Sequence, residues 1–237
     1  MKTSRRQHEQ KWGNAVKKAV IFDFDGTIID TESAWFDIYQ QILKERHGFD
    51  LTLDEFVKVV GSTDGKLFDR IEETLGFTLD RAEFHELVNA RFEIIREQLT
   101  LRDGFLETAK QLEARGIAMA VASSSTREWI EGFLTKYGLI SYFPIIVSAD
   151  DVETVKPDPA IYLTALDRLG VTADEAIAVE DSYNGSIAAI SAGIHCLIIP
   201  NDVTRSLSFH EKGQLMESFA DFDYALLGQP DDGGACV

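Results

Sequence analysis

Cysteine and basic residues are scarce in this sequence. Its 237 residues include two cysteines, and 23 Lys and Arg face 40 Asp and Glu, which gives a formal charge of −17. Two cysteines, at positions 196 and 236, do not suggest a disulfide framework or a cysteine metal cluster, so we expect a reducing, cytoplasmic setting. The negative charge argues against nucleic acid or an anionic membrane as a partner, because both attract basic surfaces.

Long apolar runs are also missing. No run approaches the ~20 residues that cross a bilayer, and the start of the chain has basic residues but no apolar signal segment. We interpret residues 1–17 as a flexible, solvated arm. Residues 229–237 lack apolar content, so we expect a disordered tail there.

The sequence does contain an alternation of short apolar runs and segments with helical spacing. The apolar runs are residues 19–22, 117–122, 145–147, 176–179 and 195–199. The helical segments between or beside them are residues 104–115, 126–137, 159–169 and 182–192, each followed by a glycine. This alternation predicts an α/β fold, an open parallel sheet with helices on both faces, whose ligands bind beyond the carboxyl ends of the strands.

Residues 33–100 interrupt the alternation. They are rich in Leu, Phe, Ile, Glu and Arg and predict helices over 34–46, 53–60, 66–75 and 81–98. We therefore predict a helical cap domain at 33–100, inserted into a core domain of residues 18–32 and 101–228. Its position in the sheet favours a lid over an inert structural insertion.

Four acidic residues lie at the ends of predicted strands, Asp23 and Asp25 after the first and Glu180 and Asp181 after the fourth. Two carboxylates 4 Å apart repel by about 4 kcal/mol at an effective dielectric near 20, so the group needs a cation or protons. A hard, oxygen-seeking ion such as Mg²⁺ would meet that need and could bridge to a phosphate. One carboxylate could then attack phosphorus while a second moves a proton.

Phosphoryl transfer also needs donors and positive charge around the phosphoryl oxygens. Gly26 and Thr27 suit a turn that a phosphate can approach closely, and Ser123, Ser124 and Lys156 can supply donors and charge. The simpler alternatives are helix capping and solvated loops. We prefer capping for Ser125 and Ser182.

Four ordered segments together resemble the motifs of the haloacid dehalogenase (HAD) superfamily. They are Asp23-Phe24-Asp25-Gly26-Thr27, Ser123, Lys156-Pro157-Asp158-Pro159 and Glu180-Asp181-Ser182-Tyr183-Asn184-Gly185. A helical insertion directly after the first motif is similar to the cap of the β-phosphoglucomutase-like and phosphoglycolate-phosphatase-like branch. The resemblance implies a HAD-like Rossmannoid core carrying that cap.

The resemblance also implies roles for single residues. Asp23 would be the nucleophile and a metal ligand, and Asp25 the general acid and base that also gives its backbone carbonyl to Mg²⁺. Ser123 would bind the transferring phosphoryl group, and Lys156 would pair with that group and with the nucleophile. The metal site would be completed by Asp181, assisted by Glu180.

The expected function is therefore a Mg²⁺-dependent phosphatase that hydrolyses small phosphorylated metabolites, sugar phosphates in particular, through an aspartyl-phosphate on Asp23. Residues 30–32 resemble the opening of capped sugar-phosphate phosphatases, so Glu32 would contact sugar hydroxyls and Lys66 a distal anionic group. We expect a monomer whose partner is the small metabolite.

Two alternatives stay open. The first is a phosphomutase of the β-phosphoglucomutase type. Such mutases resemble one another in carrying a His and an Arg at the positions where this sequence has Trp35 and Asp64, so these two residues disfavour a mutase. The second is a non-catalytic regulatory protein that retains the fold, which the presence of every motif carboxylate disfavours.

Overall fold

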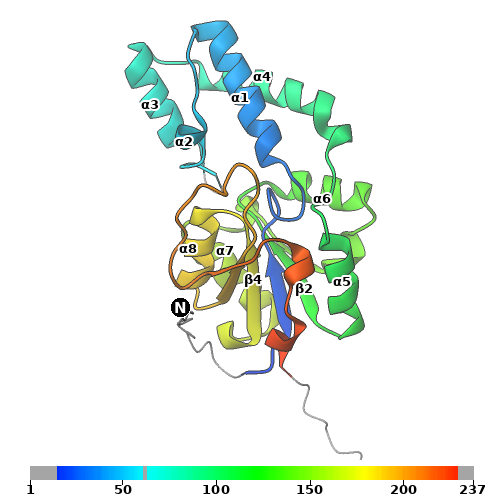
Figure 1. Cartoon of the computed structure of the whole chain (residues 1–237). Helices are drawn as coiled ribbons and strands as arrows, with labels where there is room; N and C mark the ends of the chain where they lie inside the picture. Colours follow the sequence, from blue (N-terminus) through cyan, green and yellow to red (C-terminus); the bar gives the residue numbers. More distant parts are fainter. Residues whose placement is uncertain (1–14, 61–62, 229–237) are drawn as a thin grey trace, which may run out of the picture.

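The structure, a computed structural model, describes residues 15–60 and 63–228. A parallel sheet with helices around it forms one part, and helices α1 to α4 form a second part above the carboxyl ends of the strands (Figure 1). The predicted α/β fold with a helical insertion is confirmed. Residues 1–14 of the expected arm and the expected tail at 229–237 lie outside the described residues.

The sheet has the strand order β3-β2-β1-β4-β5-β6, and every pair of neighbours is parallel. Its strands are β1 (Ala19–Phe22), β2 (Ala118–Ala122), β3 (Ile145–Val147), β4 (Ala176–Glu180), β5 (His195–Ile198) and β6 (Gln214–Leu215). The first five are the predicted apolar runs. The sequence did not predict β6, because its two residues are both exposed and form no apolar run.

The chain runs from β1 to β2 and β3 on one side and then crosses to β4 and β5 on the other. Such a reversal opens a crevice at the carboxyl ends of the strands on either side of it. The residues that follow β1, β2 and β4 are therefore expected to lie close to one another.

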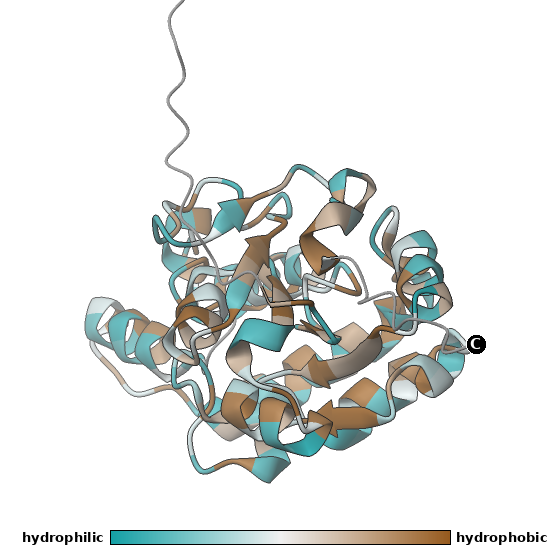
Figure 2. Ribbon diagram, turned by 90° about the horizontal axis from the view of Figure 1, so that it is seen from below, coloured by the Kyte–Doolittle hydropathy of each residue, from teal (hydrophilic) through white to brown (hydrophobic). Residues whose placement is uncertain are grey.

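Alternate residues of the strands feed two cores, one on each face of the sheet. Large residues such as Val20 and Phe22 pack with helices α5 (Phe105–Ala114) and α6 (Arg127–Lys136). The other face carries Ala120, Ala122 and Ala178 beneath α7 (Ala160–Leu169) and α8 (Tyr183–Ser191). Figure 2 shows the apolar strands enclosed between these helices.

The insertion contains α1 (Glu32–His47), α2 (Leu53–Phe56), α3 (Gly65–Leu75) and α4 (Arg81–Ile95). Two predicted helices are shorter than expected, since α2 stops at Phe56 instead of residue 60 and α4 continues from Ile95 only as a 3-10 turn. The 3-10 helices are η1 (Arg96–Gln98), η2 (Ile140–Tyr142), η3 (Ala149–Asp151), η4 (Ala173–Glu175), η5 (Phe219–Asp221) and η6 (Tyr224–Leu227). Within the described part of the chain, none of the helices is both long and apolar enough to cross a membrane.

Two connections join the insertion to the core, and a backbone bridge ties them together. Ile29 on the outgoing connection pairs antiparallel with Leu101 on the returning one. The backbone N–H of Arg102 also donates to the carbonyl of Ile28 at 2.9 Å. The two crossings are therefore held side by side at the mouth of the crevice.

Lys17 differs from its expected place in a solvated arm. It is buried, its Nζ donates to the carbonyl of Asp174 at 2.5 Å, and its backbone N–H donates to the carbonyl of Leu227 at 2.8 Å. Burial lowers the pKa of this ammonium, against the attraction of Asp174. The buried core thus begins before β1, at Lys17, a charged residue that we expected to be exposed to solvent.

We predict that Phe105→Ala destabilises the protein by about 3–5 kcal/mol. The Phe105 ring is fully buried and meets the rings of Phe22 and Phe219 edge to face, with centroids 5.6 and 5.5 Å away. Leu106→Ala on the same helix, where the side chain is 38% exposed, is the control and should cost less than about 1 kcal/mol. Urea unfolding followed by circular dichroism measures both, and equal losses would contradict this packing.

Candidate active site

Three buried carboxylates meet where β1 and β4 end. Asp23 follows β1 and its backbone N–H donates to the carbonyl of Val179 at 2.9 Å, while Glu180 ends β4 and Asp181 follows it. One carboxylate oxygen from each of the three lies within 4.8 Å of the others. The side chain of Asp25, also predicted as a metal residue, is not part of this group.

The ammonium of Lys156 lies among these carboxylates. Its Nζ is 2.5 Å from Oδ1 of Asp23 and 2.7 Å from Oε1 of Glu180, and its side chain is inaccessible to solvent. The hydroxyl of buried Tyr162 donates to the same Glu180 oxygen at 2.5 Å. Oε1 of Glu180 thus has two partners, and the ammonium of Lys156 pairs with two of the three carboxylates.

The electrostatics of this group call for more positive charge. Burial and the neighbouring Asp23 raise the pKa of Glu180 to about 7, although Lys156 and Tyr162 oppose the rise. Burial and the charges of Asp23, Glu32 and Glu180 raise the pKa of Asp181 well above its ordinary value. Burial would lower the pKa of Lys156, but Asp23 and Glu180 outweigh it and raise that pKa. These carboxylate oxygens fit the donor set of a hard metal cation.

Two residues fix the position of Asp181. Nδ2 of Asn201 donates to its Oδ2 at 2.6 Å, and Oδ1 of Asn201 accepts from the backbone N–H groups of Val203 and Thr204. Gly26 has φ +77°, and a Cβ placed on it would lie 2.2 Å from Oδ2 of Asp181. The turn after β1 therefore requires glycine both for its backbone angle and for its closeness to Asp181.

The same turn is held from outside by Arg102. Its Nη1 donates to the carbonyls of Gly26 and Ile199 at 2.8 and 2.7 Å, and its Nη2 donates to the carbonyl of Pro200 at 3.0 Å. Thr27, a predicted substrate contact, is buried with its hydroxyl 3.4 Å from Oδ1 of Asp181. It contacts one of the three clustered carboxylates and does not line the cavity described below.

The Asp25 carboxylate accepts three hydrogen bonds. Ser125 Oγ donates to Oδ2 at 2.6 Å, while Nε1 of Trp129 and Oγ1 of Thr31 donate to Oδ1 at 3.0 and 3.1 Å. Burial raises the pKa of Asp25, Asp23 adds to the rise, and the three hydrogen bonds oppose it. The group is therefore both rigidly held and inclined to keep a proton.

The capping expected of Ser125 is wrong. The residue that caps α6 is Thr126, whose hydroxyl accepts from the backbone N–H of Trp129, and Ser125 is thereby free to face Asp25. The capping expected of Ser182 is confirmed, because its hydroxyl accepts from the backbone N–H of Gly185 at 3.1 Å.

A cavity of about 310 Å³ opens between the sheet and the insertion. From the core it is lined by Asp23, Asp25, Ser123, Ser124 and Ser125, and from the insertion by Glu32, Trp35, Tyr39, Phe56, Val59, Val60, Thr63 and Asp64. Ser123 is buried, and its Oγ accepts from the backbone N–H of Ser125 at 3.1 Å. Lys66, a predicted substrate contact, is exposed on α3 and does not line this cavity.

The wall supplied by the insertion is polar and acidic at two points. Oδ2 of Asp64 accepts from the hydroxyl of Tyr39 at 2.5 Å and lies 2.9 Å from Nε2 of His85. Glu32 is buried, and burial together with Asp25 and Asp23 raises its pKa well above the ordinary value. Among the described lining residues, none is Lys or Arg.

Sequence reasoning missed the residues that hold the reactive ones in place: Arg102, Trp129, Tyr162 and Asn201. Asn201 follows a predicted strand, which was a usable signal. The other three lie within or beside predicted helices, where the sequence does not show which side chains reach the sheet edge.

Comparisons with known proteins agree with this geometry. The family described as haloacid dehalogenase-like hydrolase matches residues 20–199. The chain is similar to "Putative phosphatase YhcW" of Bacillus subtilis, with 44% identity over 89% of this chain and 96% of that protein. It is also similar to the phosphorylated carbohydrates phosphatase of Thermotoga maritima, with 32% identity over 75% of this chain and 82% of that one.

Among solved structures, a mutant of CbbY from Rhodobacter sphaeroides in complex with xylulose-(1,5)bisphosphate superposes with a TM-score of 0.73. It is 29% identical and covers 89% of this chain and 99% of its own. These relatives and the matched hydrolase family support a phosphatase, the enzyme class expected from the sequence. On the match over residues 20–199 and the 44% identity to a relative of nearly equal length, this chain belongs to the haloacid dehalogenase-like hydrolase family.

Proposed function

We propose that the chain hydrolyses small phosphate monoesters, sugar phosphates in particular, through an aspartyl-phosphate on Asp23 and with Mg²⁺ as its metal. The observation that carries the proposal is the position of Asp23, which reaches the cavity while its Oδ1 lies 2.5 Å from Nζ of Lys156. An anionic nucleophile beside a buried cation can meet a phosphoryl group without leaving its charge uncompensated. The carbohydrate substrates of the Thermotoga relative support the sugar class.

The metal would be held by the side chains of Asp23, Asp181 and Glu180, with the backbone carbonyl of Asp25 as a further ligand. When bound, it would neutralise the carboxylates and the phosphoryl oxygens. The close contact of Gly26 and Asn201 with Asp181 keeps that carboxylate oriented toward the group.

In the first step, a carboxylate oxygen of Asp23 attacks phosphorus as the bond from phosphorus to the leaving oxygen breaks. Asp25 gives its proton to that oxygen, so the leaving group departs as an alcohol. The raised pKa of Asp25 favours the protonated form that this step needs. Lys156 pairs with the phosphoryl oxygens, and Ser123 donates to them from the end of β2.

In the second step, water attacks phosphorus of the aspartyl-phosphate, and Asp25, now a carboxylate, takes its proton. The bond from phosphorus to the Asp23 oxygen breaks, which restores the Asp23 carboxylate and releases inorganic phosphate. The insertion covers the cavity during both steps and limits bulk water.

The wall of the insertion selects the leaving group. Trp35, Phe56, Val59 and Val60 offer apolar surface, and Asp64 offers a fixed carboxylate. Such a wall suits the carbon frame and hydroxyls of an uncharged leaving group and repels a second phosphate. This repulsion disfavours the phosphomutase alternative, since a mutase must hold a second phosphate while its intermediate reorients.

We predict that Asp23→Asn lowers kcat by ~10³-fold or more, because the amide keeps the shape of the side chain but cannot attack phosphorus. Release of inorganic phosphate from a generic aryl phosphate measures the effect. Thermal unfolding should show a folded variant. Retained turnover in this variant would exclude the covalent role of Asp23.

We predict that Gly26→Ala raises the Mg²⁺ concentration needed for half-maximal activity by ~10–100-fold, because the added Cβ displaces Asp181. Gly48→Ala is the matched control, since Gly48 also has a positive φ, +66°, but its added Cβ meets nothing within 4 Å. A Mg²⁺-dependent rise in Tm gives a second readout that needs no turnover. If the two variants respond to Mg²⁺ alike, the proposed metal site is wrong.

We predict that a hexose monophosphate is hydrolysed with a higher kcat/KM than the corresponding bisphosphate, and that Asp64→Asn narrows the difference by relieving repulsion. Measuring both free phosphate and the isomeric sugar phosphate in the same reaction distinguishes hydrolysis from phosphomutase activity. Dominant isomerisation would favour the phosphomutase instead.

A further inference from the structure

Trp129 of α6 joins the two parts of the molecule. Its indole Nε1 donates to Oδ1 of Asp25 at 3.0 Å. Its ring packs against Phe92 of α4 and Trp35 of α1, with centroids 4.9 and 5.6 Å away. One side chain of the core thus contacts the proposed general acid and two rings of the insertion.

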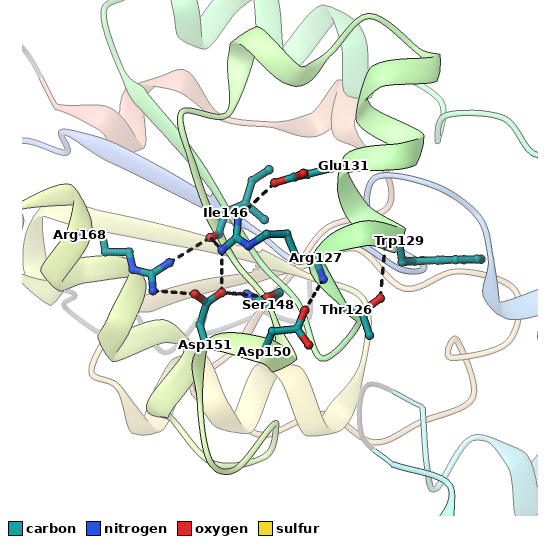
Figure 3. Close-up of polar contacts among 9 residues, drawn as sticks. All are labelled: Thr126, Arg127, Trp129, Glu131, Ile146, Ser148, Asp150, Asp151 and Arg168. Atoms are coloured by element: carbon teal, nitrogen blue, oxygen red, sulfur yellow. Dashed lines mark hydrogen bonds and ion pairs between the residues drawn. The ribbon is translucent and has the colours of Figure 1, made fainter. Parts of the chain in front are cut away.

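The backbone that carries Trp129 is held firmly. Arg127, two residues earlier, donates through Nη2 to Asp151 at 2.8 Å and through its backbone N–H to Asp150 at 2.8 Å. Arg168 of α7 donates to the second oxygen of Asp151 at 2.7 Å. Figure 3 shows this network beside the start of α6, with the Trp129 ring directed away from it. The network fixes the first turn of α6 to the loop after β3.

A cation of the insertion also lies near the Trp129 ring. The guanidinium of Arg96 lies 5.8 Å from the Trp129 ring and 4.9 Å from the Phe133 ring. It sits against Gly132, where an added Cβ would lie 2.8 Å from its Nη2. Trp35 stacks on Phe92 at 3.9 Å, which extends the aromatic contact into the insertion. The orientation of the Trp129 ring therefore depends on both parts.

The hydrogen bonds to Asp25 are unequal. Within residues 15–60 and 63–228, Oδ1 accepts from both Trp129 and Thr31, while Oδ2 accepts from Ser125 alone. A carboxylate oxygen has two lone pairs, so Oδ1 has both engaged and Oδ2 has one left. An indole N–H can only donate, so Trp129 keeps Oδ1 as an acceptor. Oδ2 is thereby left as the oxygen that carries the transferable proton.

We propose that Trp129 is a positioning residue for proton transfer, which holds Oδ1 of Asp25 so that Oδ2 faces the leaving oxygen. The inference rests on the proposed role of Asp25 as general acid. Its effect should scale with how much a leaving group needs a proton.

Trp129→Phe tests the inference, because it keeps an aromatic ring and removes the N–H. At saturating Mg²⁺, kcat/KM for an alkyl phosphate should fall by ~10-fold or more, since its alcohol needs the proton, while kcat/KM for 4-nitrophenyl phosphate should change by less than about 3-fold. Equal losses on the two substrates would overturn the positioning role. Asp25→Ala gives the full loss expected when the acid is removed.

Tyr137→Phe is the matched control. It removes one hydroxyl from another aromatic residue of the same helix region, a hydroxyl that donates to the carbonyl of Leu99 and not to Asp25. It should affect both substrates equally. If the loss of kcat/KM depends on the leaving group in Asp25→Ala but not in Trp129→Phe, the role of Trp129 is wrong and that of Asp25 stands. If the loss in Asp25→Ala does not depend on the leaving group, the role of Asp25 as general acid is wrong as well.

The indole proton gives a readout without catalysis. In a ¹H–¹⁵N spectrum, the Trp129 indole signal is identified by its loss in Trp129→Phe. In Asp25→Ala the same signal should move upfield as its acceptor is removed. An unmoved signal would overturn the hydrogen bond on which the inference depends.

Discussion

The structure depends on the meeting of three buried carboxylates, two of which pair with one buried ammonium. Strong repulsion is expected between the buried carboxylates of Asp23, Glu180 and Asp181. The ammonium of Lys156 compensates only part of their negative charge. Burial, and after it the repulsion between these carboxylates, raises the pKa values of Glu180 and Asp181. In the proposed function, an added cation would offset this charge and would allow the site to accept a dianionic phosphate.

The parallel sheet makes this meeting possible for residues far apart in the chain. Asp23 and Glu180 lie close together because β1 and β4 are neighbours and end at the same edge. Lys156, 133 positions after Asp23, reaches both carboxylates from the connection between β3 and α7. The faces of the sheet are unequal. Large side chains support the crevice from one side, and alanines let α7 and α8 lie close on the other, so the edge is backed by packed helices on both sides.

Much of this could be predicted from sequence, because the strands are short apolar runs and the acids follow them directly. The motif carboxylates were recognisable since they follow such runs, and Lys156 was recognisable since it precedes Pro157-Asp158-Pro159. Trp129 was not, because the sequence does not give the direction in which a helical side chain points. Ser125 was misjudged for a related reason: Thr126 competes for the same cap, and only the backbone angles decide between neighbours. The strand β6 is too short and too exposed to leave a pattern.

The bridge between Ile29 and Leu101 has a mechanical consequence. Two independent connections would allow the insertion to twist as well as to tilt relative to the core. Two connections that are paired with each other act as one pivot. The backbone N–H of Gly26 donates to the carbonyl of Ile29 at 2.8 Å, so that pivot is attached to the turn next to Asp25. A rotation of helices α1 to α4 about this pivot would therefore be transmitted to the loop that carries Asp25.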